Sequence, residues 1–562
     1  MRLLAVWLTV SCAFLACAGG VAPLDRSDGG PVSPGGSADG GVLPDGGQPA
    51  GPDGGGPDAG PSDGGAVPPP DAGAPDAGPA PDAGRPDAGP PPDAGRPDAG
   101  PPPDAGRPDA GPPPDAGVPD AGVPDAGPPP DLGETTWTSL LDPSLSRFYR
   151  WLPSQGRNKD PEGVFKMEGD VLHILGLPTT GKSKDFGYVA TWDEFHDYRL
   201  RLEQKWGTAT FPPRQNQPRD SGLLYHLHAP DQIWPRCVEF QIMEHNTGDT
   251  WMLSGTGLTA TVADVHASPP RFDPLGQEVA LRGGQLIKSS ETESLTGWNA
   301  IELIASGRDS VNIVNGTRVN AATDLETDDG DGWSSLRQGR IALQAEGAEV
   351  FYRNVQMRPL VYLPPPQGAV VLFDGSDLDA WMQKDGSPAR WRLVDGAMEV
   401  VPGTGDIYSH RWFGDVHVHV EFQVPESRSG AAEQDRGNSG VYLQSHYEVQ
   451  ILDSFGATLS GANDCGAIYG VHDAAVNESF PPGIWQSYDI AFRAPRWSGR
   501  TKVSPARITV VWNGTRVQQD VEVWGSTTLG DAEIPGEPDG PLRLQDHGHR
   551  VRYRNIWVQR LP

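Results

Sequence analysis

The chain has 562 residues and a formal net charge of −30, and many of its 72 Gly and 58 Pro lie near the amino terminus. With no basic stripe to meet phosphates, this charge argues against nucleic acid as a partner. Of the 4 cysteines, Cys12 and Cys17 lie in the first segment, and Cys237 and Cys465 do not correspond in the repeat described below. This argues against a disulfide framework.

Residues 1–17 are predicted to be a secretory signal. Arg2 precedes an apolar stretch, Leu3 to Phe14, that is too short to span a bilayer. Phe14-Leu15-Ala16-Cys17 resembles a bacterial lipobox. It predicts lipidation of Cys17, export across the inner membrane, and anchoring to the outer membrane or cell surface. An ordinary signal peptide cut near Ala18 is the alternative.

Residues 18–133 are low in complexity and built on Pro-Asp-Ala-Gly. Bulky apolar side chains are almost absent, so this segment cannot bury enough surface to offset the entropy lost on ordering. Proline favours extended polyproline II, while glycine and like-charged aspartate keep the chain solvated. The segment is therefore predicted to be a disordered linker between an anchored Cys17 and a folded portion.

From residue 134 the composition changes, and a long internal repeat appears. Asn-Gly-Thr-Arg-Val occurs at Asn315–Val319 and again at Asn513–Val517. The period is far longer than that of solenoids or propellers, so it indicates whole duplicated domains. We place them at residues 134–360 and 366–562, with Pro364-Pro365-Pro366 as a stiff joint.

Short strands dominate both copies. Tyr198–Glu203 and Val416–Phe422 alternate with period two, and Val311–Val314 and Arg507–Trp512 each run into Asn-Gly, a hairpin signal. No long amphipathic helix competes with these strands. The predicted fold class is all-β, with two tandem β-sandwiches.

The second copy resembles the 3-keto-disaccharide hydrolase family, formerly a domain of unknown function. The resemblance is carried by Phe373–Trp381, Asn438–Leu443, Tyr447–Asp453, Gly466–Gly470 and Arg554–Ile556. It implies a concanavalin-like, laminin-G-like jelly-roll sandwich in each copy. It also implies hydrolysis of glycosides already oxidised to a ketone at C3 of the sugar.

The first copy departs from this pattern. It keeps Glu239 and Gln241, but Asp220 replaces the Asn before Ser-Gly, and Glu244 replaces the Asp of Gln-Ile-Leu-Asp. A clear match to Gly-Ala-Ile-Tyr-Gly is missing. A binding role is at least as well supported there as activity, so the second copy is predicted to be the catalyst.

Period-two geometry places Glu448 and Gln450 on one face of their strand, and Tyr442 and Gln444 on one face of the strand before it. Asp453 joins that face only if the strand bulges or ends there. The candidate catalytic residues are Glu448, Gln450, Asp453, Tyr469 and His472. The candidate substrate-binding residues are Asn438, Tyr442, Gln444, Asp464, Asp473, Glu239, Gln241 and Glu244.

A 3-keto group makes the proton on C2 acidic. Glu448 is the candidate base for its removal, with Asp453, Tyr469 or His472 as the acid or as the group that polarises the ketone. Aglycone expulsion and hydration of the enone would follow. Two alternatives stay open: direct hydrolysis by two carboxylates, and polarisation of the ketone by a divalent cation. For the function as a whole, the alternative is a non-catalytic, carbohydrate-binding surface lipoprotein.

Overall fold

The computed structural model describes residues 130–175, 186–428 and 430–562. The predicted signal segment, Cys17 and nearly all of the predicted linker lie outside these ranges. Strands and loops make up the described chain, apart from one short 3₁₀-helix, η1 (Glu433–Asp435). In the part of the chain so described, no helix has the length and apolar character needed to cross a membrane.

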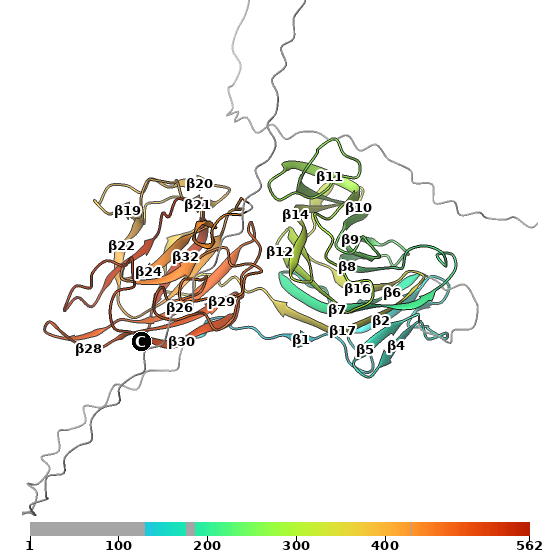
Figure 1. Cartoon of the computed structure of the whole chain (residues 1–562), viewed down its shortest axis with the longest axis horizontal. Coiled ribbons are helices and arrows are strands. Elements are labelled where there is room, and N and C mark those ends of the chain that lie inside the picture. Colours follow the sequence, from blue (N-terminus) through green and yellow to red (C-terminus); the bar gives the residue numbers. More distant parts are fainter. Residues whose placement is uncertain (1–129, 176–185, 429) are drawn as a thin grey trace, which may run out of the picture. The chain divides into compact units, whose positions relative to one another are not determined.

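The first sandwich is built from β1 to β17 (Figure 1). One layer holds, in pairing order, β13 (Asp309–Val314), β12 (Asn299–Ser306), β7 (Tyr198–Thr210), β17 (Ala348–Pro359), β5 (Val171–Ile174) and β4 (Phe165–Glu168), with β1 (Thr138–Ser139) beside β17. The other holds β3 (Gly156–Arg157), β2 (Phe148–Leu152), β6 (Gly187–Thr191), β16 (Arg340–Ala345), β8 (Asp220–His228), β9 (Arg236–Met243), β10 (Thr250–Val262) and β11 (Gln277–Leu286). The long strand β14 (Thr317–Asp328) pairs with β13 and β10 and so joins the layers, and β15 (Trp333–Ser335) pairs with β14.

The second sandwich repeats this plan with fewer strands. Its larger sheet contains β20 (Arg392–Val394), β21 (Ala397–Glu399), β32 (Arg552–Arg560), β23 (Val416–Gln423), β26 (Gln486–Arg493), β29 (Ala506–Trp512) and β30 (Thr515–Val523), with β18 (Val370–Phe373) beside β32. The five-stranded sheet runs β19 (Trp381–Gln383), β22 (Ile407–Phe413), β31 (Gly540–Leu544), β24 (Ser439–Leu443) and β25 (Tyr447–Ile451). A separate hairpin pairs β27 (Arg496–Ser498) with β28 (Thr501–Ser504).

Each sandwich buries its own apolar core between its layers. In the second sandwich, Val441 and Leu443 of β24 and Val449 and Ile451 of β25 point into that core. The alternate residues of these strands therefore lie on the opposite face of the five-stranded sheet, which we call the site face. Cys237 and Cys465 are both buried and unpaired.

The repeated Asn-Gly pair forms the same hairpin tip in both sandwiches. Asn315 and Gly316 have φ of 50° and 79°, and Asn513 and Gly514 have φ of 48° and 80°. Positive φ at both central residues is the geometry of a type I′ turn, for which Asn-Gly is the favoured pair. The sequence signal therefore marks the scaffold.

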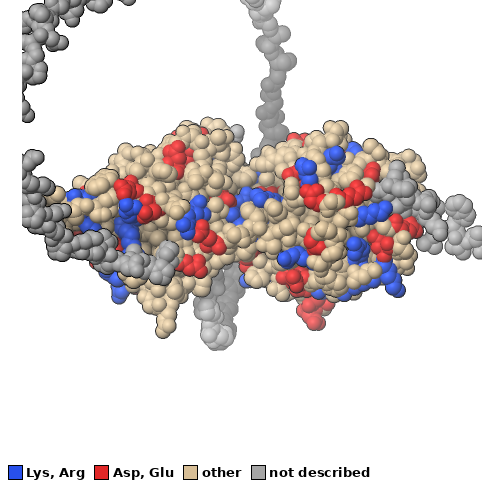
Figure 2. Space-filling view, turned by 90° about the horizontal axis from the view of Figure 1, so that it is seen from below, with Lys and Arg blue, Asp and Glu red and all other residues tan. Residues whose placement is uncertain are grey.

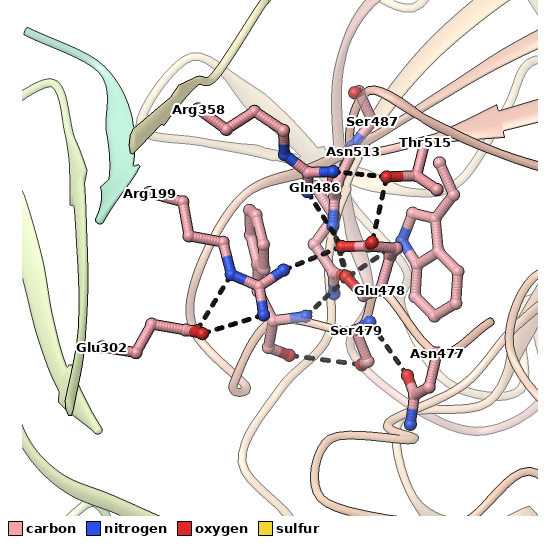
Figure 3. Close-up of polar contacts among 12 residues, drawn as sticks. Arg199, Glu302, Arg358, Asn477, Glu478, Ser479, Gln486, Ser487, Asn513 and Thr515 are labelled. Atoms are coloured by element: carbon pink, nitrogen blue, oxygen red, sulfur yellow. Dashed lines mark hydrogen bonds and ion pairs between the residues drawn. The ribbon is translucent and has the colours of Figure 1, made fainter. Parts of the chain in front are cut away.

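Figure 3 shows how the second tip is held. Asn513 Nδ2 donates to the backbone carbonyl of Glu478 at 2.8 Å, and Thr515 Oγ1 donates to the Glu478 carboxylate at 2.9 Å. The same carboxylate accepts hydrogen bonds from Arg199 at 2.8 Å and Arg358 at 2.9 Å. The polar side chains of this tip are thus occupied by structural contacts.

Charged side chains of both signs are interspersed on the face seen in Figure 2. Elsewhere in the structure, ion pairs join strands: Arg353 pairs with Glu203 in the first sandwich, and Arg554 with Glu421 in the second. These two arginines come from the repeated Arg-Asn motif and also lie 4.0 and 4.1 Å from the rings of Trp298 and Trp485. The motif therefore fastens the last strand of each sandwich to its neighbour.

Candidate active site

A row of polar side chains crosses the site face of the second sandwich. Strand register sets Tyr408 opposite Arg543, Arg543 opposite Tyr442, and Tyr442 opposite Glu448. Residues opposite each other in antiparallel strands share a face, so β22, β31, β24 and β25 each contribute one side chain to the row. Glu448 is 1% exposed, so its carboxylate lies in an environment largely closed to bulk water.

The carboxylate of Glu448 lies in the space left by a missing side chain. A Cβ atom on Gly440 would stand 2.3 Å from Glu448 Oε1 and 3.0 Å from its Cδ. With the Gln450 amide oriented to satisfy its neighbours, its nitrogen donates to Glu448 Oε1 at 3.1 Å and to the Ser439 carbonyl at 3.0 Å. Glu448 Oε2 has no hydrogen-bond partner among the described residues. Gln450 thus holds one oxygen in place, and Oε2 is buried and available as an acceptor, with the Tyr442 hydroxyl acting on the same carboxylate.

Burial raises the pKa of Glu448 to about 7. The hydroxyl of Tyr442 and the positive charge of Arg543 oppose this rise, while the nearby carboxylate of Asp406 adds to it. A carboxyl group with its pKa near neutrality can both accept and return a proton at ordinary pH. This is the property required of a general base.

Arg543 is a fixed positive charge beside that base. Its Nε is 2.7 Å from Asp406 Oδ2, and both terminal nitrogens donate to the carbonyl of Leu529 at 3.3 Å. Its guanidinium lies 3.9 Å from the ring centroid of Tyr442. A buried, oriented guanidinium can stabilise an oxyanion without reorganising during the reaction. Neither Arg543 nor Asp406 is among the residues predicted from sequence.

The Gly-Ala-Ile-Tyr-Gly segment runs along the free edge of β25. Tyr469 N donates to the Glu448 carbonyl at 3.1 Å, and Ile468 forms a bridge with Val449. This register sets Tyr469 opposite Glu448, on the site face. Tyr469 is half-buried there, and of the acid candidates it is the one that the backbone places next to the base.

Four other candidates lie apart from this row: Asp453 and His472, predicted as catalytic, and Asp464 and Asp473, predicted as substrate-binding. Asp453 follows the end of β25, where its carboxylate is 3.6 Å from Arg436. His472 is exposed, and its Nδ1 is 2.7 Å from Gln518 Oε1 on the larger sheet. Asp464 accepts hydrogen bonds from the backbone of its own loop at Ser460 and Gly461, and Asp473 is exposed.

Two candidate binding residues have structural partners. Asn438 Nδ2 donates to the Gln434 carbonyl at 2.9 Å, just before β24 begins. Gln444 lies past the end of β24 with a φ of 51°, so the regular alternation that would set it beside Tyr442 no longer applies. Its amide nitrogen donates to backbone carbonyls at 3.0 and 2.8 Å.

The equivalent row of the first sandwich is apolar except for its glutamate. Register sets Ala190 opposite Ala342, Ala342 opposite Leu224, and Leu224 opposite Glu239. The positions of Tyr408, Arg543 and Tyr442 are thus occupied by two alanines and a leucine. Trp251 of β10 stands opposite Glu239, as Tyr469 stands opposite Glu448. The first copy keeps the carboxylate and lacks the side chains around its counterpart.

This apolar row is covered. Tyr149 and Tyr188 are buried against Ala190, Leu224 and Ala342. Both tyrosine hydroxyls donate to Asp231, at 2.8 and 3.0 Å.

Glu239 has acidic neighbours. Burial and the carboxylates of Glu346 and Asp220 raise the pKa of Glu239 well above its ordinary value, and Arg214 only partly offsets this. Arg214 is shared, at 2.5 Å from Asp220 and 3.3 Å from Glu346. Gln241 donates to Asp220 at 3.1 Å. A carboxyl group in this setting favours its protonated form and is a poor base.

Glu244, the remaining candidate of the first sandwich, lies just past β9. Its carboxylate pairs with Arg219 at 2.5 Å and accepts a hydrogen bond from the backbone of the same residue at 2.7 Å. Over the ranges that the structure describes, no group of three or more His, Cys, Asp or Glu side chains is arranged to hold a metal ion.

Among solved structures, the chain is similar to a glycosyl hydrolase candidate from Parabacteroides distasonis, at 36% identity over 35% of this chain and 85% of that one, with a TM-score of 0.33. It is also similar to a carbohydrate-binding module from Bacillus subtilis, at 11% identity over 40% and 96% of the two chains, with a TM-score of 0.21. A β-glucanase from Bacillus licheniformis matches at 8% identity over 41% and 99%, with a TM-score of 0.24. No curated protein matches the chain.

The family match covers both sandwiches. The model of the 3-keto-alpha-glucoside-1,2-lyase-like domain matches residues 136–358 and, separately, residues 368–559. These segments make up more than half of the chain, and they confirm the two tandem copies predicted from the sequence motifs. The protein therefore belongs to the 3-keto-alpha-glucoside-1,2-lyase-like domain family and is a glycoside-acting enzyme of the hydrolase or lyase type.

Proposed function

We propose that the second sandwich cleaves the glycosidic bond of 3-keto-glycosides or 3-keto-disaccharides by elimination followed by hydration. One observation carries this proposal. Glu448 is a buried carboxylate with a pKa of about 7 and one oxygen available as an acceptor, set two strands from the cation Arg543 on the same face. A base and an oxyanion-stabilising group at this spacing suit proton removal next to a ketone.

The steps follow from the chemistry of the ketone. Glu448 takes the C2 proton, and the electron pair of that bond delocalises onto the C3 oxygen as an enolate. The enolate then expels the aglycone oxygen from C1, Tyr469, the acid candidate next to the base, gives it a proton, and a conjugated enone remains. Water adds at C1 and gives up a proton that restores Tyr469, while Glu448 returns a proton to C2, so the net reaction is hydrolysis. Arg543, with Tyr442, is the group that we assign to the enolate oxygen.

The contrast between the copies supports the choice of the second sandwich. Glu239 keeps the place of the base, but Ala342 and Leu224 stand where Arg543 and Tyr442 would be needed. The tyrosines that Asp231 holds close the approach to that row. An enolate formed there would have no cation at the position of Arg543, and Arg214, the cation near Glu239, is already paired with Asp220 and Glu346.

The test is aglycone release from a 3-keto-glucoside in deuterated water. Once water has entered to add at C1, the protonated Glu448 exchanges with it, so elimination and hydration place solvent deuterium at C2 of the released sugar, whereas direct hydrolysis by two carboxylates leaves the C2 hydrogen intact. The free 3-ketosugar in the same solvent without enzyme gives the background exchange at C2, which is subtracted. Release with deuterium incorporation supports the proposed route. Release without it contradicts the route, and glycan binding without release would favour the carbohydrate-binding alternative.

The pH dependence gives a second prediction. Because the base works only when ionised, kcat/KM should rise with pH up to about 7 and level off above it.

The same group makes stability depend on pH. The pKa of Glu448 is higher in the folded protein than in the unfolded chain, so folding favours the protonated form. Ionisation of Glu448 therefore costs stability as pH rises from the unfolded pKa through the folded one. Glu448→Gln should therefore gain up to about 3 kcal/mol of relative stability between pH 4 and pH 8. Urea unfolding at both pH values measures this. Equal changes with pH in both proteins would contradict it.

We also propose that the enzyme works outside the inner membrane, tethered through Cys17. The lipobox-like segment Phe14–Cys17 supports this proposal. Cys17→Ala should move the protein from the membrane fraction to the soluble fraction of cells. The reason is that the acyl chains that would hold the protein to the membrane are attached at this cysteine. An unchanged membrane fraction would contradict lipidation, and Cys12→Ala is the matched control.

A further inference from the structure

A cavity of about 310 Å³ opens at the end of the five-stranded sheet of the second sandwich. Its walls come from the end of β22, the β27–β28 hairpin and the segment that precedes β31. The apolar side chains that line it are Trp412, Trp497, Ile534, Pro495, Pro541 and Met382. Trp412 is 46% exposed and Ile534 53% exposed, which leaves apolar surface open to a ligand.

The cavity borders one end of the polar row. Tyr408 lines the cavity and is also the first residue of the row, opposite Arg543. Asp531 lines it too, and its carboxylate lies 3.8 Å from Arg543. Glu448, Tyr442 and Arg543 do not line the cavity, so a group attached to a sugar held over them would reach it past Tyr408.

Polar groups in the cavity walls are engaged with protein partners. Ser445 Oγ and Lys384 Nζ both donate to Asp531. Tyr447 and Lys502 both donate to Glu533, and the same Lys502 ammonium lies 5.2 Å from the ring of Trp497. These contacts occupy the donors named here, while Gln383 Nε2, which also lines the cavity, has no partner among the described residues. Most of the apolar surface that a ligand could contact in the cavity belongs to the indoles, prolines, methionine and isoleucine.

Four acidic residues line the cavity, and three of them are paired with cations: Asp531 with Lys384, Glu533 with Lys502 and Asp539 with Arg560. Glu537 has no ion pair among the described residues. The lining therefore offers an anionic ligand no free cation to bind. A neutral, flat, apolar group fits this lining, since stacking on aromatic faces buries area with little polar demand.

We propose that this cavity is the aglycone subsite and that it takes an aromatic aglycone, so that the preferred substrates are 3-keto-glycosides of phenols. This inference rests on the proposed function, because it places the leaving group of that reaction. Trp412, from β22, and Ile534, from the segment that precedes β31, both line the cavity, and we assign both to contact with the aglycone. Neither takes part in the chemical steps.

The test compares two substrates of the same 3-ketosugar and anomer, one with 4-nitrophenol and one with a second sugar as the leaving group. A nitrophenolate leaves more readily than a sugar alkoxide, so the relative rates of the two substrates with the wild-type enzyme do not test the subsite. The test is how much KM for each substrate changes on substitution. Trp412→Ala and Ile534→Ser should each raise KM for the aryl substrate about tenfold, with kcat nearly unchanged. KM for the disaccharide should move by less than about twofold.

Trp524→Ala is the matched control, since Trp524 is 60% exposed and lies outside the cavity lining. It should leave both KM values unchanged. Equal shifts for both substrates, or none for either, overturn the aryl subsite while the proposed function stands. Absence of turnover with both substrates overturns the proposed function, and this inference with it. Ile534 is half-exposed, so its variant keeps the test valid if Trp412→Ala unfolds.

Discussion

Glu448→Gln is expected to lower the rate of aglycone release from a 3-keto-glucoside by about 10²- to 10⁴-fold, the usual contribution of a positioned general base. The amide is isosteric with the carboxyl group, and its oxygen can still accept the hydrogen bond from Gln450. The fold should therefore persist while the proton acceptor is lost. Stopped assays of released aglycone, with a thermal melt of the same sample, measure both quantities.

Glu239→Gln is the matched control for this loss. It makes the same change at the same register position of the first sandwich, where the row beside it is Leu224 and Ala342. Release should stay at the wild-type rate. A loss with Glu239→Gln would assign the reaction to the first sandwich, and unchanged release with Glu448→Gln would remove Glu448 from the mechanism.

Gly440→Ala is expected to lower kcat by about 10²-fold with little loss of stability, because a misplacement of about 1 Å is enough to disable a catalytic group. The added Cβ would stand 2.3 Å from Glu448 Oε1, the far end of a flexible side chain. The side chain can swing aside, so the protein folds with its base displaced. A crystal structure of the variant would show the moved carboxylate.

Gly222→Ala tests the same steric conflict in the other copy. A Cβ on Gly222 would lie 2.2 Å from Glu239 Oε1 and 2.3 Å from Gln344 Oε1, so the local disturbance is at least as large. Because the reaction is assigned to the second sandwich, kcat should not change. If the two variants lose the same fraction of kcat, the loss with Gly440→Ala comes from a general disturbance of folding and not from displacement of Glu448.

The strands, and the strand face on which the candidate base lies, are the parts that sequence predicts well. Alternation with period two is enough to set Glu448 and Gln450 on one face, because the side-chain period of a strand is fixed by its backbone. The Asn-Gly signal likewise predicts the tips at Asn315 and Asn513, where both φ values must be positive. These are local properties of a few consecutive residues.

The partners of the base are not local. Arg543 and Tyr408 reach Glu448 through register across β22, β31 and β24, and register depends on which strands pair. One signal was available: the repeat aligns Arg543 with Ala342, a change from charged to apolar on a strand that otherwise matches. His472 shows the opposite case, since it is near the Gly-Tyr loop in sequence while its Nδ1 lies 2.7 Å from Gln518 Oε1 on the larger sheet.

The fit between Gly440 and Glu448 has an evolutionary consequence. Since the carboxylate occupies the volume of an absent side chain, neither position is free to change first: a larger residue at 440 expels the acid, and a smaller one at 448 leaves an empty space. Substitutions at the two positions are therefore expected to occur together or not at all. Gly222 and Glu239 keep the same arrangement in the copy that has lost the rest of the row, so the pair is retained there without its catalytic neighbours.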